Sequence, residues 1–250
     1  GTIVCELLGI PVTQQNMLAA TETEMITSPV IDEIERAARE LHRFARDLAA
    51  AKRADPGEDL CTRLLQSHDE AKMTEDELIS TYILLMVGGM EPASAIGNGA
   101  FALLTHPAQL AKLVAEPELF TDAVDEIVRF ESPFRFVPPR YTSAPITLDD
   151  VTIPAGELLL LSPGAANRDP ARFAEPDDFD VMRDTSGHLG FGHGAHRCLG
   201  AELGKIETAT ALRVLFQRFP RTRMVNLPEL AQWRPGKFMR RLDTFPVVLG

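Results

Sequence analysis

The segment Phe191 to Gly200, FGHGAHRCLG, holds a cysteine among several glycines and is the part of the chain best suited to chemistry. An apolar pattern with the three- and four-residue spacing of a buried helix face follows Cys198. Free N–H groups and the helix dipole at a helix N-terminus favour a thiolate. Glycine lets the backbone approach a flat ligand closely. Cys198 is therefore predicted to be a metal ligand or a nucleophile. The predicted helix face consists of Leu199, Leu203, Ile206, Ala209, Leu212, Leu215, Phe216 and Phe219.

Histidines close to Cys198 leave other kinds of site open. His188, His193 and His196 lie in the same stretch, and histidine and cysteine are the usual ligands of zinc. Against zinc, the segment has no C-x-x-C or H-x-x-x-H spacing. A catalytic cysteine–histidine pair would need a base in hydrogen-bond reach, and the short separation of His196 from Cys198 does not establish one. On residue type alone, a plain loop histidine is the favoured interpretation of His196.

The composition limits the class of protein. The chain has 250 residues, a net charge of −11, and no basic stripe on any predicted element, which argues against nucleic acid as its main partner. Cys5, Cys61 and Cys198 are too few and scattered for a disulfide framework and suit a reducing cytosol. The sequence contains no uninterrupted run of 18 apolar residues, so we expect no membrane span. These features predict a cytoplasmic globular protein.

The elements that must position Cys198 are mostly helices. Hydrophobic periodicity predicts a mainly α fold with a small β region. The helices are expected over residues 13–26, 30–53, 60–66, 74–105, 107–115 and 119–130. Strands are expected over 146–153 and 157–161, joined by a turn at 154–156, and over 222–225 and 244–249.

The predicted helix over about 74–105 contains a break at its centre. Thr74 to Glu77 has the form of a capping box, and the following residues are apolar nearly all round. Gly88, Gly89 and Pro92 then oppose the helix, since an interior proline alone costs about 3 kcal/mol. We expect a kink there, with freed carbonyls that bind water. The alternative is that the kink only lets the helix wrap the core.

Glu126 and Arg129 form an E-x-x-R pair on one helix face. Such a pair is most often a surface ion pair. Arg183, in the polar stretch that follows, is a candidate third member of a buried network.

FGHGAHRCLG resembles the heme-ligand loop of the cytochrome P450 family, in which a cysteine thiolate binds the heme iron. Further motifs match in the same order. Gly88-Gly89-Met90-Glu91 resembles the kinked oxygen-binding centre of the family's long helix. Glu126-x-x-Arg129 resembles its E-x-x-R pair. The stretch from residues 136–140 through 167–170 resembles the family's connecting strands.

The resemblance implies a role for each matching residue. Cys198 would be the axial ligand of heme b, and Arg140 and His196 would contact the heme propionates. Phe191 and Gly192 belong to the same cofactor-binding loop. The remaining candidates are a catalytic group in the central helix, Gly88, Gly89, Glu91 and Pro92, and a structural network, Glu126, Arg129 and Arg183.

The implied function is that of a soluble bacterial heme-thiolate monooxygenase of secondary metabolism. It would insert one oxygen atom from O2 into a small apolar substrate, with electrons from NAD(P)H through a ferredoxin and its reductase. Neither nucleic acid nor membrane is an expected partner. The alternative is a truncated or drifted relative with little or no heme oxidation, which acts as a binding or accessory protein.

The chain departs from the family pattern at two points. Pro92 stands where the family usually has a threonine, so proton delivery would rely on water in the kink, on Glu91 or on a substrate hydroxyl. The resemblance also covers only the C-terminal three-fifths of a typical member, as one P450-like domain over residues 1–250 without the family's N-terminal helices. We expect a fragment of a longer protein rather than a complete reduced relative.

Overall fold

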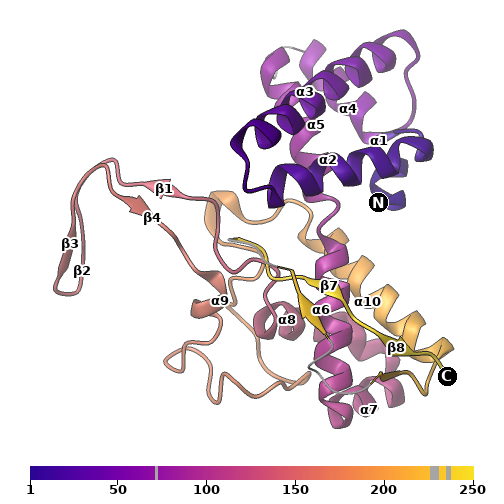
Figure 1. The fold of residues 1–250 in the computed structure, drawn as a ribbon, viewed down its shortest axis with the longest axis vertical. Helices are drawn as coiled ribbons and strands as arrows, with labels where there is room; N and C mark the ends of the chain where they lie inside the picture. The colour runs from indigo at the N-terminus through magenta and orange to yellow at the C-terminus, as the bar shows by residue number, and fades with distance from the viewer. Residues whose placement is uncertain (71–72, 226–230, 235–237) are drawn as a thin grey trace. The chain divides into compact units, whose positions relative to one another are not determined.

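The computed structural model describes residues 1–70, 73–225, 231–234 and 238–250. The chain divides into two compact units, Gly1–Glu91 and Pro92–Gly250. The first unit is helical (Figure 1). Its elements are α1 (Thr2–Leu8), the short 3-10 helix η1 (Val12–Gln14), α2 (Gln15–Thr27), α3 (Ile31–Ala54), α4 (Leu60–Asp69) and α5 (Glu75–Gly88).

The first unit is built around the long helix α3. Helix α3 packs against α2, α4 and α5, as its apolar stripe predicts. Leu41, Ala45 and Leu48 of α3 join Leu78, Ile79 and Tyr82 of α5 in one buried core. The predicted helices over 13–26, 30–53 and 60–66 are confirmed within a few residues.

The predicted helix over 74–105 begins and breaks where expected. Thr74 caps α5 in a complete capping box with Glu77. The α-helix ends at Gly88, and α6 (Pro92–Thr105) begins at the proline. Pro92 has no N–H for the Gly88 carbonyl, and the Glu91 N–H donates to that oxygen instead, at 3.3 Å. The break is thus one tight turn, and Pro92 takes the first position of the next helix, where proline is favoured.

The helical stretch Glu75–Thr105, which includes this turn, is long and apolar enough to cross a membrane by length and composition, with a mean hydropathy of 1.3. Core helices of soluble proteins share this property. The finding qualifies our expectation of no membrane span, which rests on uninterrupted apolar runs alone.

The two glycines at the break differ in their surroundings, and we expect opposite effects of alanine. A Cβ on Gly89 would lie 2.6 Å from Val4 Cγ2 and 2.9 Å from the Leu85 carbonyl oxygen. Gly89→Ala should destabilise the unit by about 1–3 kcal/mol through overpacking. Gly88→Ala is the matched control, because a Cβ there meets nothing within 4 Å, and it should be neutral or stabilising by up to about 1 kcal/mol. Urea midpoints followed by circular dichroism measure both; equal midpoints would contradict the contact.

The second unit combines helices with short paired strands (Figure 1). Helices α6, α8 and α10 pack against one another. Gly99 of α6 permits this, since a Cβ there would lie 2.9 Å from Leu212 of α10 and 3.1 Å from Ile127 of α8. The helices after α6 are α7 (Pro107–Ala115), η2 (Pro117–Leu119), α8 (Phe120–Phe130), α9 (Pro163–Ala166), η3 (Gly194–His196) and α10 (Ala201–Arg218).

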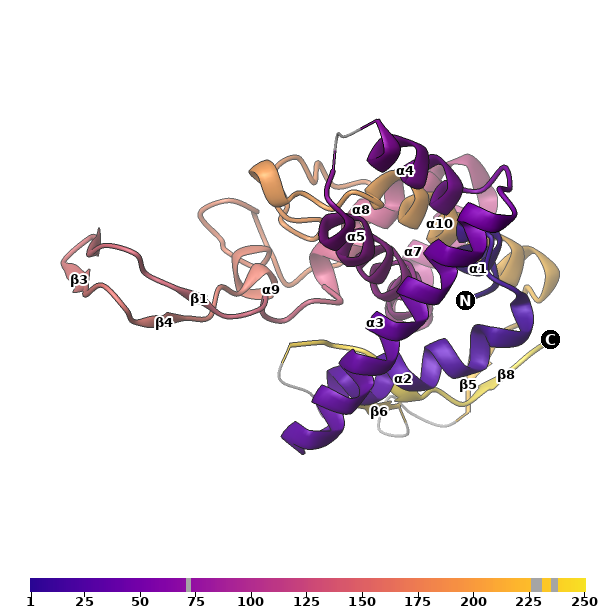
Figure 2. The same ribbon diagram turned by 90° about the horizontal axis from the view of Figure 1, so that it is seen from above.

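The strand prediction over 146–153 is wrong in detail. This segment is a hairpin of β2 (Ile146–Leu148) and β3 (Val151–Ile153), because Asp149 takes a left-handed conformation (φ 50°) and turns the chain. The segment over 157–161 contributes β4 (Leu158–Leu159), which pairs with β1 (Arg140–Tyr141) rather than with the hairpin. Figures 1 and 2 both show this ribbon of β1 to β4 extending away from α8 and α10.

The C-terminal strands are short. The strands predicted over 222–225 and 244–249 are confirmed as a pair, β5 (Arg223–Met224) with β8 (Val247–Val248). A second antiparallel pair, β6 (Gln232–Trp233) with β7 (Leu242–Thr244), lies between them in sequence.

The predicted buried face of α10 is partly wrong. Ala209, Leu212 and Phe216 are buried as expected. Leu199 is 82% exposed because it precedes the helix, and Ile206 is 60% exposed because the buried face runs through Ala201 and Thr208 instead.

Candidate heme-ligand site

Arg129 and Glu126 form a buried network on α8. Both side chains are almost completely buried, which rules out the surface ion pair. Arg129 Nε donates to Glu126 Oε2 at 2.6 Å, and Nη2 donates to Oε1 at 2.9 Å. Its other N–H groups donate to the carbonyls of Asn167, Pro176 and Asp178 at 2.9–3.2 Å. All five guanidinium donors are therefore satisfied.

Arg183 joins this network, as the sequence suggested. Its Nε lies 3.4 Å from Glu126 Oε1, an ion-pair distance without hydrogen-bond geometry. Its Nη groups donate to the carbonyls of Ala174, Glu175 and Asp178. The predicted trio Glu126, Arg129 and Arg183 thus ties α8 to the irregular segment that precedes the cysteine loop.

Asn167 carries the connection from this network to the loop. Its carbonyl accepts from Arg129, and its Oδ1 accepts from the Leu189 N–H at 2.6 Å. The side chain is fully buried. Sequence reasoning placed Asn167 in a matching stretch without a role, because its partner Leu189 is distant in sequence and only the fold brings the two together.

The loop itself closes through its backbone. The Cys198 N–H donates to the Phe191 carbonyl at 2.7 Å. Gly192 has a left-handed φ of 72°, and a Cβ there would lie 3.3 Å from the His196 carbonyl oxygen. Gly192 is thus favoured by its backbone conformation, and a side chain there would also crowd that carbonyl. The short helix η3 (Gly194–His196) then leads to Cys198, which precedes the N-cap of α10, Gly200.

The loop side chains that could meet a ligand are accessible. Cys198 and His196 are exposed, while Phe191 is half-buried. A Cβ on Gly194 or on Gly200 would meet nothing within 4 Å. The cysteine therefore lies on an open, glycine-lined surface.

The other predicted site residues lie elsewhere in the chain. Arg140 is exposed on β1 and donates to the carbonyls of Pro138 and Pro139 at 2.9 and 3.2 Å. Gly88, Gly89 and Glu91 belong to the first unit, while Pro92 and Cys198 belong to the second.

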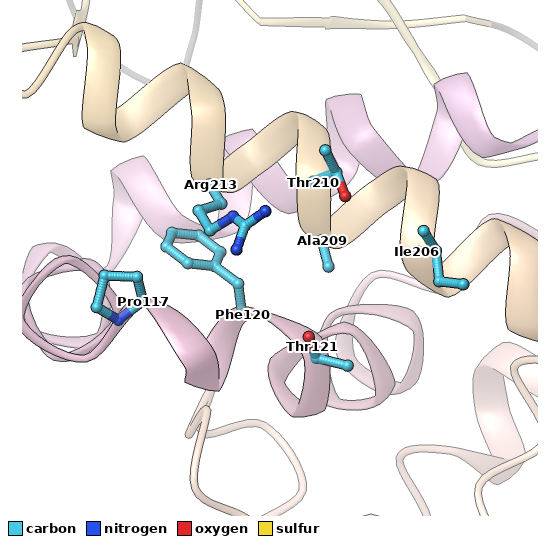
Figure 3. Close-up of a pocket in the computed structure, with 7 residues that line it drawn as sticks. All are labelled: Pro117, Phe120, Thr121, Ile206, Ala209, Thr210 and Arg213. Carbon is cyan, nitrogen blue, oxygen red and sulfur yellow. The ribbon is translucent and has the colours of Figure 1, made fainter. Parts of the chain in front are cut away.

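A shallow pocket in the second unit is too small for a substrate. Its volume is about 90 Å³, well below the roughly 300–1,000 Å³ typical of ligand sites. Figure 3 shows α10 side chains facing η2 and the start of α8 across it. Its lining residues are Pro117, Phe120, Thr121, Ile206, Ala209, Thr210 and Arg213.

The family model for cytochrome P450 matches residues 6–228. The chain belongs to the cytochrome P450 family. It is 39% identical to the vitamin D(3) 25-hydroxylase of Pseudonocardia autotrophica over 99% of this chain and 62% of that protein. It thus spans about three-fifths of the length of such curated relatives.

Solved P450 structures share the fold. The tirandamycin C-bound P450 monooxygenase TamI matches 100% of this chain and 62% of its own, with a TM-score of 0.91 and 34% identity. CxnD, a P450 for C–S bond formation in chuangxinmycin biosynthesis, matches 98% of this chain and 62% of its own, with a TM-score of 0.92 and 35% identity. The mainly α fold with small β pairs is therefore the P450 fold.

The residues at the P450 loop fit a heme better than a zinc ion. Among the residues that the structure describes, no group of three or more histidine, cysteine or acidic side chains could hold a metal ion. A protein zinc site needs several such ligands. A heme brings its own porphyrin nitrogens and needs only one protein ligand, a role that the Cys198 thiolate would fill.

The thiol of Cys198, in the cysteine loop, should be the one that reacts with a disulfide reagent in the native protein. Cys5 and Cys61 are buried, and burial raises the pKa of Cys5 and raises that of Cys61 to about 12. Both thus stay protonated and shielded near neutral pH, while Cys198 is exposed. Titration of the heme-free protein with a disulfide reagent should therefore show one fast-reacting thiol, which should be absent from Cys198→Ser. After denaturation, all three thiols of the wild-type protein should react. A second fast thiol in Cys198→Ser would contradict this.

Proposed function

We propose that this chain is the cysteine-loop part of a heme-thiolate monooxygenase that oxidises a small apolar molecule. One observation carries the proposal: an exposed cysteine on a glycine-shaped loop, tied through Asn167 to a buried Glu126–Arg129 pair. The named activities of the matched relatives, hydroxylation and C–S bond formation, support oxidation in the same class. The part that CxnD plays in chuangxinmycin biosynthesis favours a place in secondary metabolism.

The chain's own residues would hold the heme. Cys198 would bind the iron as a thiolate, and Phe191 and Gly192 would shape the loop around it. His196 and Arg140 would donate hydrogen bonds to the propionates, because basic side chains form strong hydrogen bonds with carboxylates. When bound, heme b supplies the activation of dioxygen for insertion into the substrate. Electrons would come from NAD(P)H through a ferredoxin and its reductase in the cytoplasm.

Residues at the break between α5 and α6 would deliver protons. Helix α5 ends at Gly88 with Gly89 as its C-cap, and Pro92, which begins α6, has neither a hydroxyl nor an N–H. Glu91 is then the acid that remains next to the break. It would pass protons through water held at the turn.

The proposed role of Glu91 can be tested by replacing it and by adding a second substitution that should partly restore coupling. Glu91→Gln should lower the share of consumed NADPH that ends in product about tenfold or more, since a positioned acid contributes roughly 10²–10⁴-fold. Adding Pro92→Thr to that variant should restore part of the loss, because the new hydroxyl offers a second route. Vitamin D(3), the substrate named for one relative, serves as first probe. Glu58→Gln, at an exposed position, is the control. Unchanged coupling in Glu91→Gln would contradict the role.

A carbon-monoxide difference spectrum of the reduced, heme-loaded protein tests the proposed function. The long-wavelength Soret band typical of thiolate-ligated heme is the expected result. Failure to show that band after heme supplementation would favour the alternative of a binding or accessory protein with the P450 fold and no oxidation.

A further inference from the structure

A second cluster of charged groups contacts the start of the cysteine loop and is separate from the Glu126–Arg129 network. His188 lies just before the loop, and Asp125 of α8 pairs with both His188 and Lys205 of α10. The side chains are mostly buried, with exposures of 12%, 23% and 20% for His188, Asp125 and Lys205. Adjacent carboxylates of α8 thus have separate partners: Glu126 binds the arginines, and Asp125 binds the loop.

The hydrogen bonds of His188 define its tautomer. The Gly190 N–H donates to His188 Nδ1 at 3.2 Å, so Nδ1 is the nitrogen without a proton. The Nε2–H group then donates to Asp125 Oδ1, with 3.2 Å between the nitrogen and the oxygen. The imidazole therefore links a backbone N–H of the loop to a carboxylate on α8.

Asp125 connects this link to α10. Lys205 Nζ donates to its second oxygen, Oδ2, at 2.7 Å. Burial alone would raise the pKa of Asp125, but the hydrogen bonds from His188 and Lys205 outweigh it and hold that pKa below its usual range. The carboxylate is therefore charged and bridges the loop to the helix that follows Cys198.

Phe191 contacts both the cationic and the imidazole members of the cluster. The His188 ring meets the Phe191 ring edge-on at 5.9 Å, and Lys205 Nζ lies 5.7 Å from the centre of the same ring. The Phe191 carbonyl in turn accepts the Cys198 N–H. The path from Asp125 to the sulfur-bearing residue thus runs through Phe191 in direct contacts.

We infer that Asp125, His188 and Lys205 are positioning residues that hold the backbone of the cysteine loop in place. They act on Cys198 through Gly190 and Phe191 rather than by touching it. The effect on iron ligation rests on the proposed role of Cys198, whereas the effect on the loop backbone does not.

Substitutions at His188 separate the two halves of the link. Asparagine has an acceptor near the place of Nδ1, so His188→Asn retains the bond from Gly190 and loses the one to Asp125. His188→Gln places a donor near Nε2 and retains only the bond to Asp125. His188→Ala loses both. His193→Ala is the matched control, since His193 is an exposed histidine in the same loop.

Hydrogen exchange of the peptide covering residues 189–199, read by mass spectrometry on the heme-free protein, tests the loop. Exchange should be about tenfold faster in His188→Ala than in wild type, and intermediate in His188→Asn and His188→Gln. It should be unchanged in His193→Ala. Wild-type exchange in both His188→Ala and Asp125→Ala would overturn the inference.

The heme-loaded protein gives a second readout. The share of the carbon-monoxide complex with the thiolate-type Soret band should fall in His188→Ala and recover in part in His188→Asn. A thiolate share in His188→Ala equal to that of wild type would overturn the effect on ligation. If the wild-type protein lacks the band, the proposed function fails, and the exchange result still decides the loop inference by itself.

Discussion

Replacing Arg129 with alanine is expected to cost about 3–5 kcal/mol of folding free energy, the largest stability effect of any single change considered for this chain. The substitution leaves the Glu126 carboxylate buried without its bidentate partner. It also strips the carbonyls of Asn167, Pro176 and Asp178 of a donor each. Since native domains are stable by only about 5–15 kcal/mol, this loss removes a large part of the stability of the second unit.

Arg129→Lys should rescue little. A lysine ammonium has three donors at one point, whereas the five bonds of Arg129 leave a planar fork in several directions. Arg39→Ala is the control, because Arg39 forms an exposed pair with Glu35 on α3 that should contribute under about 1 kcal/mol. Urea unfolding measures all three variants, and a loss below about 1 kcal/mol in Arg129→Ala would contradict the buried network.

Replacing Cys198 with serine is expected to abolish the thiolate-type carbon-monoxide spectrum while leaving the fold intact. The serine hydroxyl is nearly isosteric but stays protonated near neutral pH, so it supplies no soft anionic ligand to iron. Because Cys198 is exposed, its loss should change the free energy of unfolding by no more than about 0.5 kcal/mol. Spectra and urea midpoints of the same preparations measure the two effects.

His193→Ala tests whether any change in this loop has the same effect. It should retain the thiolate-type band, since it leaves the sulfur in place. A thiolate-type spectrum that survives in Cys198→Ser would refute Cys198 as the ligand. Cys5 and Cys61 are not expected to replace it, because both are buried in the core of the other unit.

Local patterns predicted the features whose physics is local. The capping box at Thr74 and the break at Pro92 follow from neighbouring residues, and both lie where the sequence placed them. The two-stranded hairpin over 146–153 was not predicted, although Asp149 and Asp150 are turn-forming residues that strands disfavour. The left-handed backbone at Asp149 shows where the turn lies.

The cysteine loop was predictable as a segment, but its anchors were not. Glu126 and Arg129 have a readable spacing, yet their burial depends on residues 167–183, which show little periodicity. Asn167 and the cluster of Asp125, His188 and Lys205 join distant parts of the sequence. Such contacts depend on how α8 and α10 pack, which single-sequence spacing does not determine.

The uneven burial of the three cysteines determines which of them oxidises when the protein is stored. A thiol that is exposed and not bound to metal is open to stepwise oxidation, and two copies of the chain can join through it. The sulfur that would bind iron is thus also the cysteine sulfur most open to oxidation. Oxygen in storage would remove the ligand while leaving the helices, the buried arginine network and the melting behaviour unchanged.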